Sequence, residues 1–196
     1  MSTPYPSDPV QAAANRRLGL YLFLISLSVL FGVSLVAYLI VRLSGTHTLP
    51  SGDIHLPTNL WISTVILLAS GWSLHKAVAL SCQNDLLGVC RSLFITSLLG
   101  LAFLGIQTPC MLELLADHYY GITQHIFGIY GLTFALILIH AVHVLGGIIP
   151  MFVLTWMAWR RSLSPSHFPT LDALAIYWRF LEIVWIILFG VFLITS

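Results

Sequence analysis

Long apolar stretches alternate with short polar ones along the whole chain. A helix that crosses a bilayer needs about 20 mostly apolar residues. Five stretches meet that length, at residues 18–42, 58–80, 92–115, 126–158 and 173–195. The polar connections between them are too short to hold a soluble domain. The pattern therefore predicts an all-α integral membrane protein, with a single bundle of five transmembrane helices over residues 18–196.

The stretch before the first predicted span is polar. Residues 1–17 are rich in proline and alanine and end in Asn15, Arg16 and Arg17. No small-residue cleavage site follows a short apolar core, so we expect a retained first span and not a removed signal peptide. We expect the N-terminal tail, residues 1–17, to be loosely ordered. In the long fourth stretch, Pro150 removes one backbone hydrogen bond and favours a kink.

Composition agrees with a membrane protein. Hydrophobic residues make up 58% of the 196, charged residues only 8%, and the mean hydropathy is +0.95. Soluble domains carry about a quarter charged residues. The net charge of +1 argues against nucleic acid as a partner. The three cysteines are odd in number and form no C-x-x-C motif, so neither a disulfide framework nor a zinc site is indicated.

The charged residues predict an orientation. Threading five spans places most basic residues toward one side: Arg16, Arg17, Lys76, Arg91, Arg160, Arg161 and Arg179. Arg42 falls on the other side, together with Asp53, Glu113 and Asp117. Loops rich in lysine and arginine stay in the cytoplasm. We therefore expect a cytoplasmic N-terminus and a periplasmic C-terminus.

Two histidines interrupt the fourth apolar stretch. His140 and His143 lie within residues 134–149, and their i, i+3 spacing places both on one helix face. Ionisable residues at this depth are rare and often functional. The pair has the chemistry to ligate a metal or haem, to carry protons, or to bond one helix to another.

Metal and haem ligation are the weaker alternatives. Two histidines on one helix are too close to occupy opposite axial positions of a haem, while His75 and His125 are expected at opposite membrane sides. A non-haem metal needs further ligands, and Glu182 is the only carboxylate well inside a predicted span. Bonding between helices is favoured, so the sequence predicts no catalytic, cofactor-binding or metal-binding residue in this chain.

The fifth stretch carries a charged pair. Arg179 precedes Glu182 by three residues, so the two can meet on one helix face. Glu182 is interpreted either as a proton-path carboxylate or as half of an ion pair that extends to His143 on another helix. The ion pair is favoured, because a fixed cation makes a carboxylate a poor proton relay. Glycines expected to allow close helix approach are Gly100, Gly105, Gly128, Gly131, Gly146 and Gly147.

The spans together resemble subunit III of haem-copper terminal oxidases, in its short five-helix bacterial form. Residues 19–31, with Tyr38 and Arg42, are similar to the family's "G-x-x-L-F-I-x-S…F…Y-x-x-x-R" opening. Residues 56–64, continued by Ala69-Ser70 and Ala77, look like its "L-P…L…S-T…S-S…A" helix. The third span matches "T…L-G…F-L-x-x-Q" through Thr96, Leu99-Gly100, Phe103-Leu104 and Gln107.

The most specific matches lie in the last two spans. Residues 140–146 match the family's "H-x-x-H-V-x-G", and residues 177–185 match "Y-W-H-F-V-D-x-V-W". Some positions depart from the family's pattern. Leu27 follows Ser26 where many relatives have an acidic residue, and Cys110 stands where a glutamate is common. In the last motif an arginine and a glutamate, at positions 179 and 182, replace histidine and aspartate.

The resemblance implies a non-catalytic subunit in a bacterial inner (plasma) membrane. It would bind no redox centre, pack directly on subunit I, lie beside subunit II, and hold phospholipids. Haem and copper would belong to the partner subunits, which reduce oxygen and pump protons. His140, His143, Arg179, Glu182, Gln107 and Ser26 are expected to serve polar packing inside the membrane. The electron donor is expected to be cytochrome c. Subunit III of a quinol oxidase, a nitric oxide reductase accessory protein and a free-standing cytochrome b are alternatives.

Overall fold

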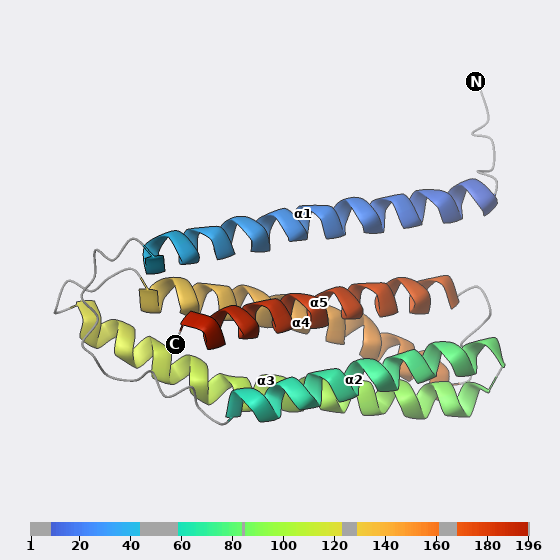
Figure 1. Cartoon of the computed structure of the whole chain (residues 1–196). Coiled ribbons are helices and arrows are strands. Elements are labelled where there is room, and N and C mark those ends of the chain that lie inside the picture. Colours follow the sequence, from blue (N-terminus) through green and yellow to red (C-terminus); the bar gives the residue numbers. More distant parts are fainter. Residues whose placement is uncertain (1–8, 44–58, 84, 123–128, 161–167, 196) are drawn as a thin grey trace, which may run out of the picture.

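Five long helices account for the regular structure of the described residues (Figure 1). The computed structural model describes residues 9–43, 59–83, 85–122, 129–160 and 168–195. The helices are α1 (Pro9–Leu43), α2 (Asn59–Cys82), α3 (Leu86–Ile122), α4 (Ile129–Trp159) and α5 (Phe168–Thr195). Each contains a segment long and apolar enough to cross a membrane. The predicted all-α, five-span fold is thus confirmed.

Two helices begin earlier than the hydrophobic pattern indicates. α1 begins at Pro9, so residues 9–17 of the predicted tail belong to the helix, and proline suits a first helical position because its missing N–H needs no partner there. α3 begins at Leu86, where a polar loop was expected. The carboxylate of Asp85 accepts a hydrogen bond from the Gly88 amide at 3.1 Å and caps this helix.

Helices α2, α3, α4 and α5 form a closed ring, in which each packs on the one before and α5 returns to α2. Neighbours in the ring run antiparallel (Figure 1). α1 lies outside it and, within the described residues, packs only on α4 and α5. Its span is the least buried, with 17% of positions inside the protein against 50% for α5. Two helices have a proline in their interior and continue past it, α3 at Pro109 and α4 at Pro150.

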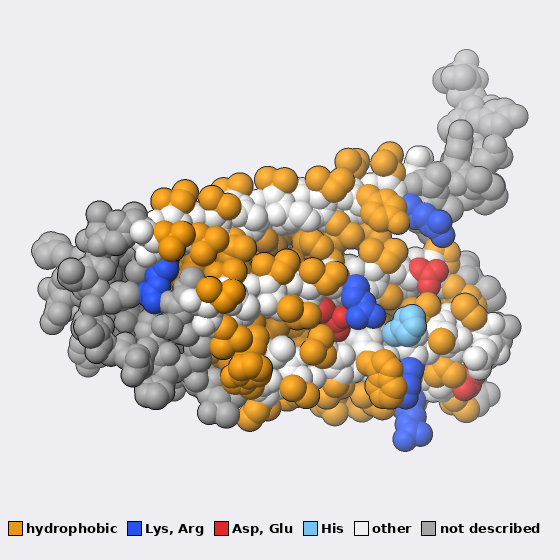
Figure 2. All heavy atoms as spheres, viewed as in Figure 1, with side chains coloured by type: hydrophobic (Ala, Val, Ile, Leu, Met, Phe, Trp, Pro, Cys, Tyr) orange, Lys and Arg blue, Asp and Glu red, His pale blue; other side chains and the backbone are white. Residues whose placement is uncertain are grey.

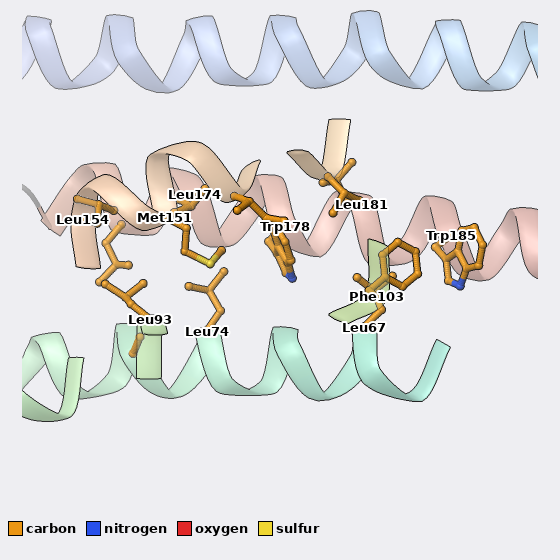
Figure 3. Packing of buried hydrophobic residues seen from close by; sticks show 14 of the residues in the cluster. Leu67, Leu74, Leu93, Phe103, Met151, Leu154, Leu174, Trp178, Leu181 and Trp185 are labelled. Carbon is orange, nitrogen blue, oxygen red and sulfur yellow. The ribbon is translucent and has the colours of Figure 1, made fainter. Parts of the chain in front are cut away.

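The centre of the ring is packed with leucine, methionine and aromatic side chains (Figure 3). Trp178 and Trp185 of α5 are its largest members, each at most 1% exposed. A second cluster joins α1 to the ring through Phe31 and Tyr38. Most of the outer surface is also apolar (Figure 2), as expected of helices that face lipid.

Only some of the glycines permit a close helix approach. A Cβ at Gly147 would lie 3.0–3.1 Å from ring atoms of Trp178 and Tyr177, and one at Gly100 would lie 3.1–3.3 Å from Trp178 and Ile148. The expectation is wrong for Gly105, where a Cβ would meet nothing within 4 Å. At Gly146 it would make one ordinary contact of 3.8 Å. Gly128 lies outside the described residues.

Candidate functional site

Two tryptophans bond α5 to α2. The Trp178 indole Nε1 donates to the Ser70 hydroxyl at 3.0 Å, and the Trp185 Nε1 donates to the Thr64 hydroxyl at 3.0 Å. Each hydroxyl also donates to a carbonyl of its own helix, at Leu67 and Leu60. Tryptophans seven residues apart share a helix face, and a buried indole N–H needs an acceptor. These two bonds fix the register of α5 on α2.

Between the two tryptophans, the predicted ion pair is present. The Arg179 Nη1 donates to the Glu182 Oε2 at 3.2 Å, so the expected meeting of these residues is confirmed. The Glu182 side chain is 2% exposed and that of Arg179 is 60% exposed. The other carboxylate oxygen, Oε1, has no hydrogen-bond partner among the described residues. It lies against Gly71 of α2, where a Cβ would overlap the carboxylate.

The pair lies deep within its span. The spans of α5 and α2 run from Phe168 to Ile194 and from Leu60 to Cys82. Arg179 and Gly71 therefore lie near the midpoints of their spans. A groove of about 380 Å³ between α2 and α5 is lined by Gly71, Leu74, His75, Ala175, Ile176, Trp178, Arg179 and Glu182. Charged and histidine side chains gather on this face (Figure 2).

His140 is enclosed by aromatic rings from three other helices. It is 1% exposed, and its ring centroid lies 6.2 Å from that of Phe31, 6.0 Å from Phe103 and 5.2 Å from Trp185. Neither ring nitrogen has a hydrogen-bond partner among the described residues. Among the described residues, this imidazole does not form the hydrogen bond between helices that the sequence predicts. It packs between helices as a flat ring.

His143 bonds to another helix through its backbone. Its ring Nδ1 donates to the Ile139 carbonyl of the same helix at 2.6 Å, and its ring lies against Phe31 of α1. The Tyr177 hydroxyl of α5 donates to the His143 carbonyl at 2.8 Å. The suggested extension of the ion pair to His143 is wrong, because this ring faces α1 while the Glu182 carboxylate faces α2.

The other predicted polar residues lie apart from the ion pair. Gln107 of α3 is 3% exposed, and neither of its amide atoms has a partner among the described residues. Ser26 is exposed on α1, outside the ring. The part of the chain that the structure describes contains no group of three or more histidine, cysteine or acidic side chains able to hold a metal. The six residues therefore do not form one site.

Sequence reasoning missed Ser70, Thr64 and Gly71 as functional positions. A signal for the two hydroxyls was present, because Trp178 and Trp185 are seven residues apart and each needs an acceptor inside the bundle. Nothing in the sequence pointed to Gly71, whose role depends on where the Glu182 carboxylate lies.

Five apolar helices, two of which are joined by tryptophan hydrogen bonds, define a multi-pass membrane helical bundle. A comparison with family sequence models identifies the family within this class. The model described as "Cytochrome c oxidase subunit III" matches residues 8–196. The chain therefore belongs to the cytochrome c oxidase subunit III family, as its motifs predicted.

Curated relatives agree with this assignment. The chain is 33% identical to cytochrome c oxidase subunit 3 of Thermostichus vulcanus, over 92% of this chain and 88% of the relative. It is 32% identical to cytochrome bo(3) ubiquinol oxidase subunit 3 of Pseudomonas aeruginosa, over 92% and 85%. Identity to cytochrome c oxidase subunit 3 of Bacillus subtilis is 28%, over 95% and 91%. The chain is a multi-pass bacterial membrane protein of a haem-copper oxidase subunit family.

Proposed function

We propose that this chain is a non-catalytic subunit III that supports a respiratory haem-copper oxidase. The haems and copper belong to its partner subunits I and II, which reduce oxygen and translocate protons, and this chain packs directly on subunit I. The family match over residues 8–196 carries the proposal. The geometry supports it, because Trp178 and Trp185 use their indole N–H groups to bond α5 to α2 within the bundle.

Cytochrome c is the proposed electron donor of the complex. The relative from Thermostichus vulcanus is named a cytochrome c oxidase subunit, but that from Pseudomonas aeruginosa is named a ubiquinol oxidase subunit at nearly the same identity. A quinol-oxidising complex is therefore the second candidate. Oxygen uptake by the purified complex, with reduced cytochrome c and then with quinol as the sole donor, separates the two.

Deleting the chain tests the supporting role. We expect an oxidase without it to keep its haem spectrum and its initial rate, while turnover decays faster than in the complete complex. Loss of all haem on deletion would contradict the proposal. A Soret band stoichiometric with the purified chain would contradict it as well, and would favour a membrane cytochrome b.

We also propose a cytoplasmic N-terminus, a periplasmic C-terminus and bound phospholipids. Arg17, Lys76, Arg91 and Arg160 all lie toward the end of the bundle where α1 begins and α2 meets α3. Basic residues are retained on the cytoplasmic side. Labelling of single cysteines placed near each helix end, with a membrane-impermeant reagent on intact cells, tests the orientation. Co-purified lipid, identified by mass spectrometry, tests the binding.

A further inference from the structure

The exposed guanidinium of Arg179 lies where a lipid-facing arginine should not. The span of α5 contains 27 residues, so it is about 40 Å long at about 1.5 Å per residue. Arg179 is eleven residues, or about 16 Å, from the first residue of that span. An arginine near a helix end normally extends toward the nearer membrane surface. This one pairs with Glu182 instead, which holds its charge near the midpoint of the span.

The ion pair with Glu182 does not cover this charge. A guanidinium has five N–H donors in a planar fork, and its side chain here is 60% exposed. Glu182 is bonded from the inner side, at 2% exposure. Donors that face hydrocarbon are costly because lipid tails offer no acceptor. The outer side of Arg179 therefore needs oxygen acceptors at midplane depth.

The depth of the groove limits which molecules can supply oxygen acceptors to Arg179. Lipid phosphates lie outside a hydrocarbon core about 30 Å thick, so they remain about 15 Å from the midplane. A second copy of this chain, packed through the same face, would bring Arg179 and His75 toward their own equivalents. Both residues are exposed and line the groove, and like basic groups repel each other. A transmembrane helix of a different chain can place an oxygen acceptor at this depth, and it need not carry basic side chains there.

We propose that the α2–α5 groove docks a transmembrane helix of another oxidase subunit, which presents a carboxylate or carboxamide oxygen to Arg179 at the bilayer midplane. The inference rests on the proposed function and adds the face through which the chain meets its partner. Gly71 gives the groove a floor without a side chain, and the exposed Ile176 and Ile183 flank Arg179 along α5. These apolar side chains would pack around the polar contact and exclude lipid from it.

Photo-crosslinking within the intact oxidase tests the docking. Benzoylphenylalanine would replace Ile176 or Ile183 in chains that keep Arg179, with the complex purified from native membranes after irradiation. Leu98 of α3 is the control, because it is 57% exposed and lies near the midpoint of its own span. We expect both groove positions to form adducts with one transmembrane helix of another oxidase subunit, next to an acidic or amide residue, more efficiently than the control position does.

A substitution series tests the role of the guanidinium. Arg179→Gln should reduce the fraction of the chain retained on the complex during detergent washing about tenfold, the effect of losing one charge-assisted contact. Arg179→Lys should retain more, and Arg91→Gln, which removes an exposed arginine of α3, should have no effect. Replacing the crosslinked oxygen-bearing residue of the partner with alanine should cause the same loss, with no further loss in the double variant.

The outcomes separate this inference from the function beneath it. Suppose that the purified complex contains the chain, but the crosslinker forms adducts only with lipid or with a second copy of this chain. This result would overturn the proposed docking and leave the proposed function intact. Additive losses in the double variant would overturn the contact with Arg179. A purified oxidase that never contains the chain would overturn the proposed function and the docking together.

Discussion

Replacing Gly147 with alanine should weaken the bundle, whereas the same change at Gly146 should not. The two glycines are adjacent in α4, so the substitutions share the gain in helix propensity of about 1 kcal/mol. They differ in what the new methyl group meets. At Gly147 it would lie 3.0–3.1 Å from ring atoms of Tyr177 and Trp178, and at Gly146 it would lie 3.8 Å from the Tyr177 hydroxyl.

The size of the difference follows from how little Trp178 can move. Its side chain is 1% exposed and its indole N–H is bonded to Ser70. Forcing an extra methyl group into such packing costs about 1–3 kcal/mol. Since the propensity gain is common to both, Gly147→Ala should be less stable than Gly146→Ala by about 1–3 kcal/mol.

Reversible unfolding of the purified chain measures this difference. Mixed micelles with rising SDS content, followed by circular dichroism and tryptophan fluorescence, give a free energy of unfolding for each variant. Gly147→Ala should also change the fluorescence of the folded state, because the methyl group displaces an indole. Equal stabilities for the two variants would refute the packing argument.

Other substitutions probe the polar contacts of the bundle. His140→Leu should leave the free energy of unfolding unchanged or raise it by about 1 kcal/mol, because it removes two buried ring nitrogens that have no hydrogen-bond partner among the described residues. A loss above about 2 kcal/mol would contradict this. A double-mutant cycle of Trp178→Phe and Ser70→Ala should give a coupling free energy of unfolding of about 0.5–1.5 kcal/mol. If the two losses of stability simply add, the hydrogen bond contributes nothing. Gly71→Ala should cost about 1–2 kcal/mol by displacing the Glu182 carboxylate. This loss should shrink in a chain that also carries Glu182→Ala, as measured by the same unfolding assay.

The features that the sequence predicted are local ones. Five spans follow from length and hydropathy, because backbone groups in lipid must be satisfied within each helix. The pairing of Arg179 with Glu182 follows from a separation of three residues on one helix. The hydropathy pattern starts the third span at residue 92, because it does not detect the cap: Asp85 caps the start of α3 six residues before the charged Arg91.

The features that the sequence did not predict depend on how the helices rotate against each other. The His140 ring could form a hydrogen bond or only pack against its neighbours. The outcome depends on the rings of Phe31, Phe103 and Trp185, which surround it from three other helices. The carboxylate of Glu182 could face α1, α2 or α4, and its direction depends on the register of α5. Hydropathy carries no information about that register, because all five helices are apolar on most of their circumference.

The closure of the ring by α5 has a consequence for how the protein is made. The contacts of α2 with α3, and of α3 with α4, join neighbours in the chain and can form as each hairpin enters the membrane. Trp178 and Trp185 reach back over more than a hundred residues to Ser70 and Thr64. A nascent chain thus holds an open row of helices until α5 is synthesised. The ring, and the surface on which a partner could assemble, are therefore complete only after α5 has entered the membrane.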